Sequence, residues 1–135
     1  QAKLAFKLFT ETFSGPRWEA LATRGARVQR PLWASTSTKN PEYPDTLYVD
    51  ELIGPDTVNT LPDATLEAFA DHGTVARRID ADVDQAEAVW AALPGVGVDM
   101  DDVADQLERE GVASFMGAFD ELIEALEAKA AELGS

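Results

Sequence analysis

The 135-residue sequence lacks cysteine and contains a single histidine, His72. Disulfides and thiolate metal sites are therefore excluded, and neither a zinc centre nor a hydrolytic triad is readily assembled from one histidine. No apolar run approaches the roughly 20 residues that a membrane-spanning helix needs, so we expect no membrane partner. The first residues show no charged end followed by an apolar block, so we expect no secretion signal and a cytoplasmic location.

Basic residues are also scarce. The sequence contains 11 Lys and Arg and 25 Asp and Glu, which gives a formal net charge of −14. Such a charge repels phosphate backbones, so nucleic-acid binding is not expected. Among the first 41 residues, however, basic side chains outnumber acidic ones. The acidic residues are Glu11 and Glu19, and the basic ones are Lys3, Lys7, Arg17, Arg24, Arg27, Arg30 and Lys39. An anionic ligand is therefore expected near this third of the chain, or near Arg77 and Arg78.

The hydrophobic pattern predicts many helices and few strands. Helices are expected over 2–13, 17–23, 46–53, 64–71, 83–93, 100–110 and 112–133, and extended runs over 26–34, 56–61 and 74–79. Asp63, Asp82 and Asp99 are candidate N-caps, with Gln85 placed to complete a capping box. Gly111 is expected to end the helix that begins after Asp99. The acidic residues around Asp99 lack the pattern of a calcium loop and are typical of a helix start, so no metal site is predicted.

Strands that alternate with helices predict an α/β fold with a parallel sheet. A complete (β/α)₈ barrel, or TIM barrel, takes about 250 residues. Residues 1–80 contain the elements of late βα units, and residues 81–135 are helical. We therefore expect a helix-rich, incomplete C-terminal part of such a barrel.

The densest group of polar residues is 35–40 (STSTKN), directly after the extended run 26–34. Strand ends open onto the active-site face of a barrel, so these hydroxyls and the ammonium of Lys39 could hold an anion. An ordinary polar turn explains the same composition. Asn59 and Thr60 end the next extended run, and Arg77 and Arg78 end the one after it, where barrels often bind phosphate.

Several segments carry a family resemblance. They are RVQRPLWASTSTKNP at 27–41, YPDTLYVDEL at 43–52 and TVNTLP at 57–62, with further similarity over 9–18 and 115–126. Together these segments resemble the C-terminal portion of transaldolases of the actinobacterial type, over essentially the whole chain. The resemblance implies a (β/α)₈ barrel of the class I aldolase type.

The resemblance also implies a reaction. Transaldolases are transferases of the pentose phosphate pathway that move a dihydroxyacetone unit between sugar phosphates: sedoheptulose 7-phosphate, fructose 6-phosphate, erythrose 4-phosphate and glyceraldehyde 3-phosphate. A lysine forms a Schiff base with the ketose, and this imine accepts the electrons of the broken C–C bond. No metal or organic cofactor is implied.

The family places that lysine in the N-terminal half of the barrel, and none of the motifs around it occurs here. We therefore expect no catalytic residue in residues 1–135, and no activity from this fragment alone. Ser35 matches the family serine that helps to bind the substrate phosphate. The family's partner arginine has no counterpart, and Lys39 is the expected substitute. Thr36 and Asn59 would complete the phosphate site, with Arg77 or Arg78 reaching it from the next unit.

Part of a barrel leaves strand edges and core faces open, so a partner is expected. It could be the N-terminal half of the barrel or a second copy of the chain. Two other hypotheses remain open at this point. The chain could be a non-catalytic helical interaction or oligomerisation domain, or it could belong to a transaldolase fused to a sugar-phosphate isomerase.

Overall fold

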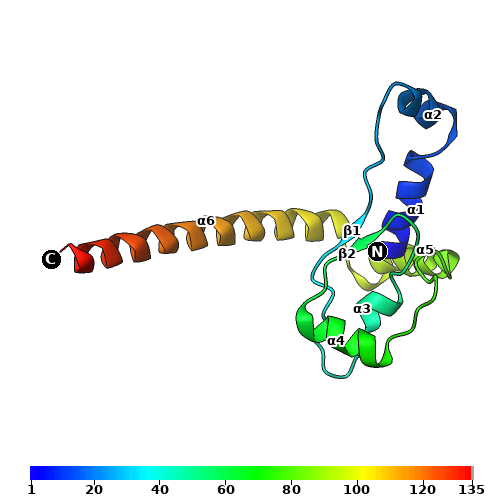
Figure 1. The fold of residues 1–135 in the computed structure, drawn as a ribbon. Helices are drawn as coiled ribbons and strands as arrows, with labels where there is room; N and C mark the ends of the chain where they lie inside the picture. The colour runs from blue at the N-terminus through cyan, green and yellow to red at the C-terminus, as the bar shows by residue number, and fades with distance from the viewer. Residues whose placement is uncertain (135) are drawn as a thin grey trace. The chain divides into compact units, whose positions relative to one another are not determined.

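The computed structural model describes residues 1–134 and divides the chain into two compact units, Gln1–Trp90 and Ala91–Ser135. In the first unit the elements follow one another in the order shown in Figure 1: α1 (Ala2–Thr12), α2 (Gly15–Thr23), β1 (Leu32–Trp33), α3 (Leu47–Asp50), β2 (Val58–Asn59), α4 (Asp63–His72) and α5 (Val83–Ala92), whose last turn crosses into the second unit. The second unit contains the 3₁₀ turn η1 (Leu93–Val96) and α6 (Met100–Leu133). In the described part of the chain, no helix combines the length and the apolar character needed to span a membrane.

The two short strands form a parallel pair, in which Leu32 lies opposite Val58 and Trp33 opposite Asn59. The N–H of Val58 donates to the carbonyl of Pro31 over 2.9 Å. β1 begins directly after Pro31, whose nitrogen has no hydrogen to donate to a ladder. A parallel pair with α3 between its strands confirms the predicted βα organisation at the level of one unit. The described residues contain two of the expected strands, and a closed barrel is not formed by them.

The predicted strand over 74–79 is wrong. This segment has no strand structure, and the N–H groups of Arg78 and Ile79 both donate to the carbonyl of Ile53, over 3.0 and 3.1 Å. A strand needs a neighbouring strand to accept its backbone hydrogen bonds, and none of the described residues supplies one at this place. The segment is instead anchored by Ile79, whose side chain is completely buried.

The core of the described residues is small. The buried hydrophobic side chains are Phe6, Val49 and Ile79, and the buried polar ones are Thr36, Thr46 and Thr65.

Aromatic side chains connect α1 to α2. The ring centroids of Phe6 and Phe9 are 5.7 Å apart, those of Phe9 and Phe13 are 5.4 Å apart, and Phe13 meets Trp18 edge-on at 4.7 Å. Edge-to-face and tilted pairs are favourable arrangements for aromatic rings. The contact between Phe13 and Trp18 spans the turn at Ser14 and Gly15. α2 begins at Gly15, before the predicted start at residue 17.

The second unit corrects one helix prediction and confirms one cap. The carboxylate of Asp99 accepts from the backbone N–H groups of Asp101 and Asp102 over 3.0 and 3.3 Å, as an N-cap does. The predicted stop at Gly111 is wrong, because α6 is one helix of 34 residues that continues through Gly111. A glycine inside a helix lowers the stability of the helix by about 1 kcal/mol relative to alanine, which a helix can tolerate. Helices end at a glycine mainly where that glycine adopts the left-handed conformation or a proline follows it.

The other two predicted caps differ from the structure. Asp63 is the first residue of α4 and Pro62 is the N-cap, so the Asp63 carboxylate acts through its charge at the start of the helix. Asp82 directly precedes α5, and its carbonyl accepts from the N–H of Ala86 over 3.1 Å, as at an N-cap position. Its φ of 56° differs from the extended backbone of an ordinary N-cap.

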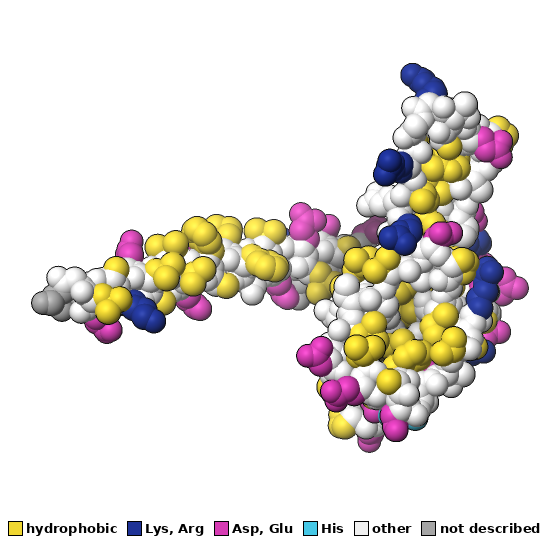
Figure 2. Space-filling model, viewed as in Figure 1, with side chains coloured by type: hydrophobic (Ala, Val, Ile, Leu, Met, Phe, Trp, Pro, Cys, Tyr) yellow, Lys and Arg dark blue, Asp and Glu magenta, His cyan; other side chains and the backbone are white. Residues whose placement is uncertain are grey.

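α6 exposes most of its apolar side chains. Figure 2 shows them along the helix, and the exposed fractions include 81% for Phe115, 62% for Phe119 and 56% for Leu126. α6 contains no buried residue, so the second unit has no core of its own.

Candidate functional site

The polar loop after β1 opens onto a pocket of about 270 Å³. One wall includes Trp33 of β1 and Ser35 and Thr36 of the loop that follows it. The other includes Tyr48 of α3 and Leu52, which lies two residues after the end of α3. Ser35 has a φ of 57°, in the left-handed region that residues other than glycine seldom adopt. Backbone conformations of this kind gather at functional sites, where the surrounding structure maintains them. Ser35 is therefore an exposed hydroxyl held at the pocket by a constrained backbone.

The next residue, Thr36, points into the protein. It is 3% exposed, and its hydroxyl donates to Oδ1 of Asn59 over 2.8 Å. Nδ2 of Asn59 in turn donates to the carbonyl of Tyr48 over 3.2 Å. Two of the predicted phosphate ligands, Thr36 and Asn59, are thus brought together beside Ser35, with their side-chain hydrogen bonds made to each other and to the backbone.

Lys39 lies on the exposed part of the same loop. Its Nζ donates to Oγ of Ser37 over 2.7 Å. This bond holds a positive charge on the loop that carries Ser35, and a surface hydroxyl is a partner that an anion can readily displace. Thr60 closes the neighbouring strand end, where its hydroxyl donates to the carbonyl of Trp33 over 3.2 Å.

The two arginines predicted to reach the phosphate are engaged elsewhere. Arg77 forms a bidentate ion pair with Asp80, which raises the pKa of Arg77 and lowers that of Asp80. Arg78 donates from Nε and from its terminal nitrogen to Oε1 of Glu51, each over 3.2 Å. Among the described residues, no hydrogen bond or ion pair links either arginine to the Ser35 loop.

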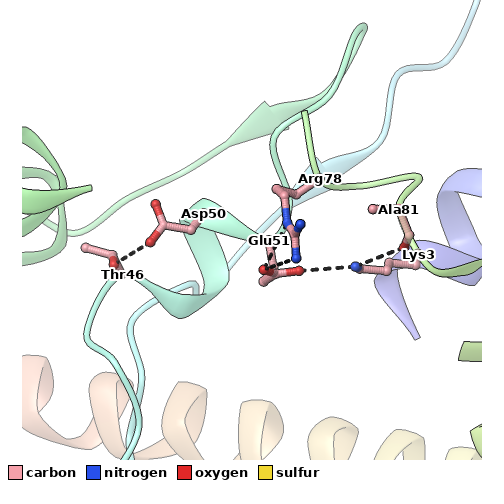
Figure 3. A network of polar contacts seen from close by, with 6 residues as sticks. All are labelled: Lys3, Thr46, Asp50, Glu51, Arg78 and Ala81. Atoms are coloured by element: carbon pink, nitrogen blue, oxygen red, sulfur yellow. Dashed lines mark hydrogen bonds and ion pairs between the residues drawn. The ribbon is translucent and has the colours of Figure 1, made fainter. Parts of the chain in front are cut away.

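Glu51 is the centre of a network that connects the start of α1 to the end of α3 (Figure 3). Nζ of Lys3 donates to Oε2 of Glu51 and to the carbonyl of Ala81, both over 3.1 Å. The hydrogen bond from Lys3 is the main reason that the pKa of Glu51 lies below its ordinary value. The network fixes α3, and with it Tyr48 and Leu52, beside the pocket.

The four lysines lie in different surroundings. Lys3 is held by Glu51, and Lys7 pairs with Glu87, whose hydrogen bond raises the pKa of Lys7. Lys39 and Lys129 are exposed to solvent on a loop and on α6.

Sequence reasoning missed the contribution of α3 to the site. Tyr48 and Leu52 are four residues apart, and this spacing places two side chains on the same side of a helical turn. That signal was present in the sequence, but it does not indicate which surface the helix faces. No pattern in the sequence predicts that the carbonyl of Tyr48 accepts a hydrogen bond from Asn59.

The arrangement defines a class: one parallel βα unit, with a constrained polar loop at the carboxyl end of its strand, as in the substrate-binding loops of α/β proteins. The comparisons with known proteins give the family. Residues 1–126 match the family model described as Transaldolase/Fructose-6-phosphate aldolase, and the chain belongs to this family.

Curated relatives agree with this assignment. A protein named Transaldolase from Frankia alni is 55% identical over 123 residues, which are 90% of this chain and 33% of that protein. Transaldolase from a Parafrankia species is 56% identical over 126 residues, or 93% of this chain and 34% of the relative. Transaldolase 2 from a Nostoc species is 48% identical over 130 residues, or 95% and 34%. The chain therefore spans about a third of the length of these relatives.

Proposed function

We propose that residues 1–135 form the phosphate-binding side of a transaldolase, a cytoplasmic enzyme of the pentose phosphate pathway. In this proposal the lysine that forms the Schiff base lies in the two thirds of the family sequence that this chain does not span. The family match supports this reading over a non-catalytic helical domain. The names of the relatives favour a transaldolase over a fusion with an isomerase.

The observation that carries the proposal is the Ser35 loop. An exposed hydroxyl with a left-handed backbone lies at the carboxyl end of a parallel strand, at the wall of a pocket, with Lys39 on the same loop. A hydroxyl, backbone N–H groups and one ammonium are suitable donors for a phosphate. We assign the phosphate of the sugar to Ser35 and Lys39. Arg77 and Arg78 receive no phosphate role, because acidic partners already occupy their guanidinium groups.

The expected substrates follow from the family reaction. The donor would be sedoheptulose 7-phosphate or fructose 6-phosphate, and the acceptor erythrose 4-phosphate or glyceraldehyde 3-phosphate. The chain would bind the phosphate end of each, while the carbonyl end reaches the lysine elsewhere. Binding the remote phosphate supplies energy that orients the reacting carbonyl.

The proposal includes a partner that covers the exposed apolar surfaces. One is the stripe on α6 that contains Phe115, Phe119, Leu122, Leu126 and Leu133. Another is a groove of about 500 Å³ beside α1, whose walls include Phe9, Phe13 and Leu32. Self-association would bring together two chains of net charge −14, which is unfavourable at low salt. The upstream part of the barrel is therefore the partner that we propose.

A chimera tests this function. Residues 1–135 replace the aligned third of the Frankia alni relative, and transfer from fructose 6-phosphate to erythrose 4-phosphate is assayed. We expect transfer by the chimera and a higher KM in Ser35→Ala. Ser114→Ala, on α6, is the matched control and should leave KM unchanged. The isolated chain, treated with fructose 6-phosphate and borohydride, should give no covalent adduct by mass spectrometry. An inactive but folded chimera, or a stoichiometric adduct on the isolated chain, would refute the proposal.

A further inference from the structure

The side chain of Asn59 connects the two walls of the pocket beside Ser35. Thr36, from the loop after β1, and Tyr48, from α3, both contribute to this pocket. Asn59 ends β2, accepts from Thr36 over 2.8 Å and donates to the carbonyl of Tyr48 over 3.2 Å. One amide thus joins elements that are separated by 11 and 23 residues in the sequence.

The chemistry of the groups fixes the direction of these bonds. A backbone carbonyl can only accept, so the NH₂ group of Asn59 must face Tyr48 and its oxygen must face Thr36. The Thr36 hydroxyl has one hydrogen, which it donates to Asn59 at 2.8 Å in preference to the carbonyl of Thr60 at 3.4 Å. That hydrogen is therefore not available to an anion in the pocket. An anion would also be repelled by Oδ1 of Asn59.

Each bond satisfies a polar group of the pocket wall, and the one to Thr36 is shorter than the alternative bond to the carbonyl of Thr60. The Tyr48 carbonyl belongs to α3, a helix of four residues. The carbonyl groups in the last turn of a helix have no partner within the helix and need one elsewhere. Thr36 is 3% exposed, and a buried hydroxyl without a good acceptor is destabilising. The amide of Asn59 serves both, and its bond with Thr36 holds the residue that directly follows Ser35.

From this geometry we propose that Asn59 is a positioning residue: through Thr36 and Tyr48 it holds Ser35 in the backbone conformation that binds the sugar phosphate, without touching the substrate itself. The inference rests on the proposed function for its substrate. It replaces the expectation that Thr36 and Asn59 are direct phosphate ligands.

A double-mutant cycle in the chimera tests the inference. Thr36→Val keeps the shape of the side chain and removes the hydroxyl, and Asn59→Ala removes the amide. Each should raise KM for fructose 6-phosphate about tenfold with a smaller change in kcat, because one hydrogen bond that orders the site is lost. The double variant should raise KM no further than Asn59→Ala alone, since that substitution already removes the partner of the Thr36 hydroxyl. Thr36→Ser keeps the hydroxyl and should restore KM to near the parent value.

The possible outcomes are distinct. Additive effects on KM would mean that Thr36 and Asn59 bind the phosphate independently, and would overturn the inference. Loss of stability with an unchanged KM in the folded variants would also overturn it, since a purely structural role would suffice.

An inactive parent chimera would refute the proposed function but leave the linkage measurable in the 135-residue chain by NMR. The Nδ2 protons of Asn59 should exchange slowly, and Thr36→Val should accelerate their exchange. Fast exchange in the unsubstituted chain would then contradict the inference on its own.

Discussion

Nε2 of His72 lies 2.9 Å from Oδ1 of Asp45, so the last turn of α4 is tied to the loop that leads into α3. Nδ1 of the same ring lies 3.1 Å from Oδ2 of Asp71. A ring between two carboxylates is best satisfied when it is protonated and donates from both nitrogens. The hydrogen bond to Asp45 is the main cause that raises the pKa of His72, followed by the bond to Asp71.

We therefore predict an imidazole pKa above the ordinary value of 6.5. Because the pKa is raised in the folded state, the stabilisation is fully present below pH 6.5 and is lost as the pH rises through the folded pKa. NMR titration reports this value directly, since the sequence has no other histidine. Asp45→Asn should lower the value more than Asp71→Asn does. In His72→Gln, the loss of stability toward alkaline pH should become smaller. A titration midpoint at or below 6.5 would contradict the prediction.

Glu51→Gln should destabilise the first unit by about 1 kcal/mol, because it removes the charge that Lys3 and Arg78 share. The pKa of Glu51 is lowered, mainly by Lys3, so its contribution is present above the ordinary value of 4.5 and is lost as the pH falls through the folded pKa. Urea unfolding at pH 7 and at low pH measures both effects. Glu67→Gln, an exposed position on α4, is the control and should change stability little. Equal effects of the two substitutions would argue against the network.

Gly54→Ala should destabilise the first unit by about 1–3 kcal/mol, as overpacked cores do. A methyl group at Gly54 would lie 2.1 Å from Cγ2 of Ile79, which is completely buried. Urea unfolding measures the change, and Gly95→Ala is the control because nothing lies within 4 Å of its added methyl group. Removal of the clashing atom in Ile79→Ala should make the Gly54 substitution less costly, so the double variant should be less destabilised than the sum of the two single variants. Strict additivity would contradict this packing.

Gly111→Ala should stabilise α6 by about 1 kcal/mol, since alanine replaces a glycine in a helix interior and meets no atom within 4 Å. Gly97 has a φ of 82°, so Gly97→Ala should destabilise by about 1 kcal/mol. Circular dichroism and thermal unfolding measure both. If Gly111 were instead a left-handed helix end, Gly111→Ala would destabilise, so the sign of its effect decides between one helix and two.

Several elements could be predicted from sequence because their signals are local. The spacing of apolar residues and Ser14-Gly15-Pro16 define α1 and the turn before α2, and Asp99 caps α6 by contacts to its own next residues. The strand predictions were longer than β1 and β2, because strand length depends on partners that the pattern of one segment does not specify. The composition of segment 74–79 predicts a strand, but no strand among the described residues lies beside it to pair with.

The candidate site divides in the same way. Ser35 and Lys39 could be proposed from the sequence, because hydroxyls and an ammonium after a predicted strand are visible in it. The ion pairs of Arg77 with Asp80 and of Arg78 with Glu51 could not be predicted from the sequence. Many carboxylates, near and far along the chain, could pair with each guanidinium group, and the sequence does not show which of them lies close in space. Residues 27–62 carried the resemblance to the family, and the family model matches residues 1–126, independently of any contact.

The sequence by itself determined most of the helices, the acidic charge, the family and the position of the polar loop, because each depends on residue identity and short-range spacing. Only the tertiary structure decided how the side chains on that loop are used. Thr36 follows β1 and Asn59 is the last residue of β2. Their mutual bond exists because the parallel pairing of β1 and β2 places the ends of these strands side by side. A hydrogen bond depends on distance and direction in space, and residues separated by 23 positions acquire both only when the chain is folded.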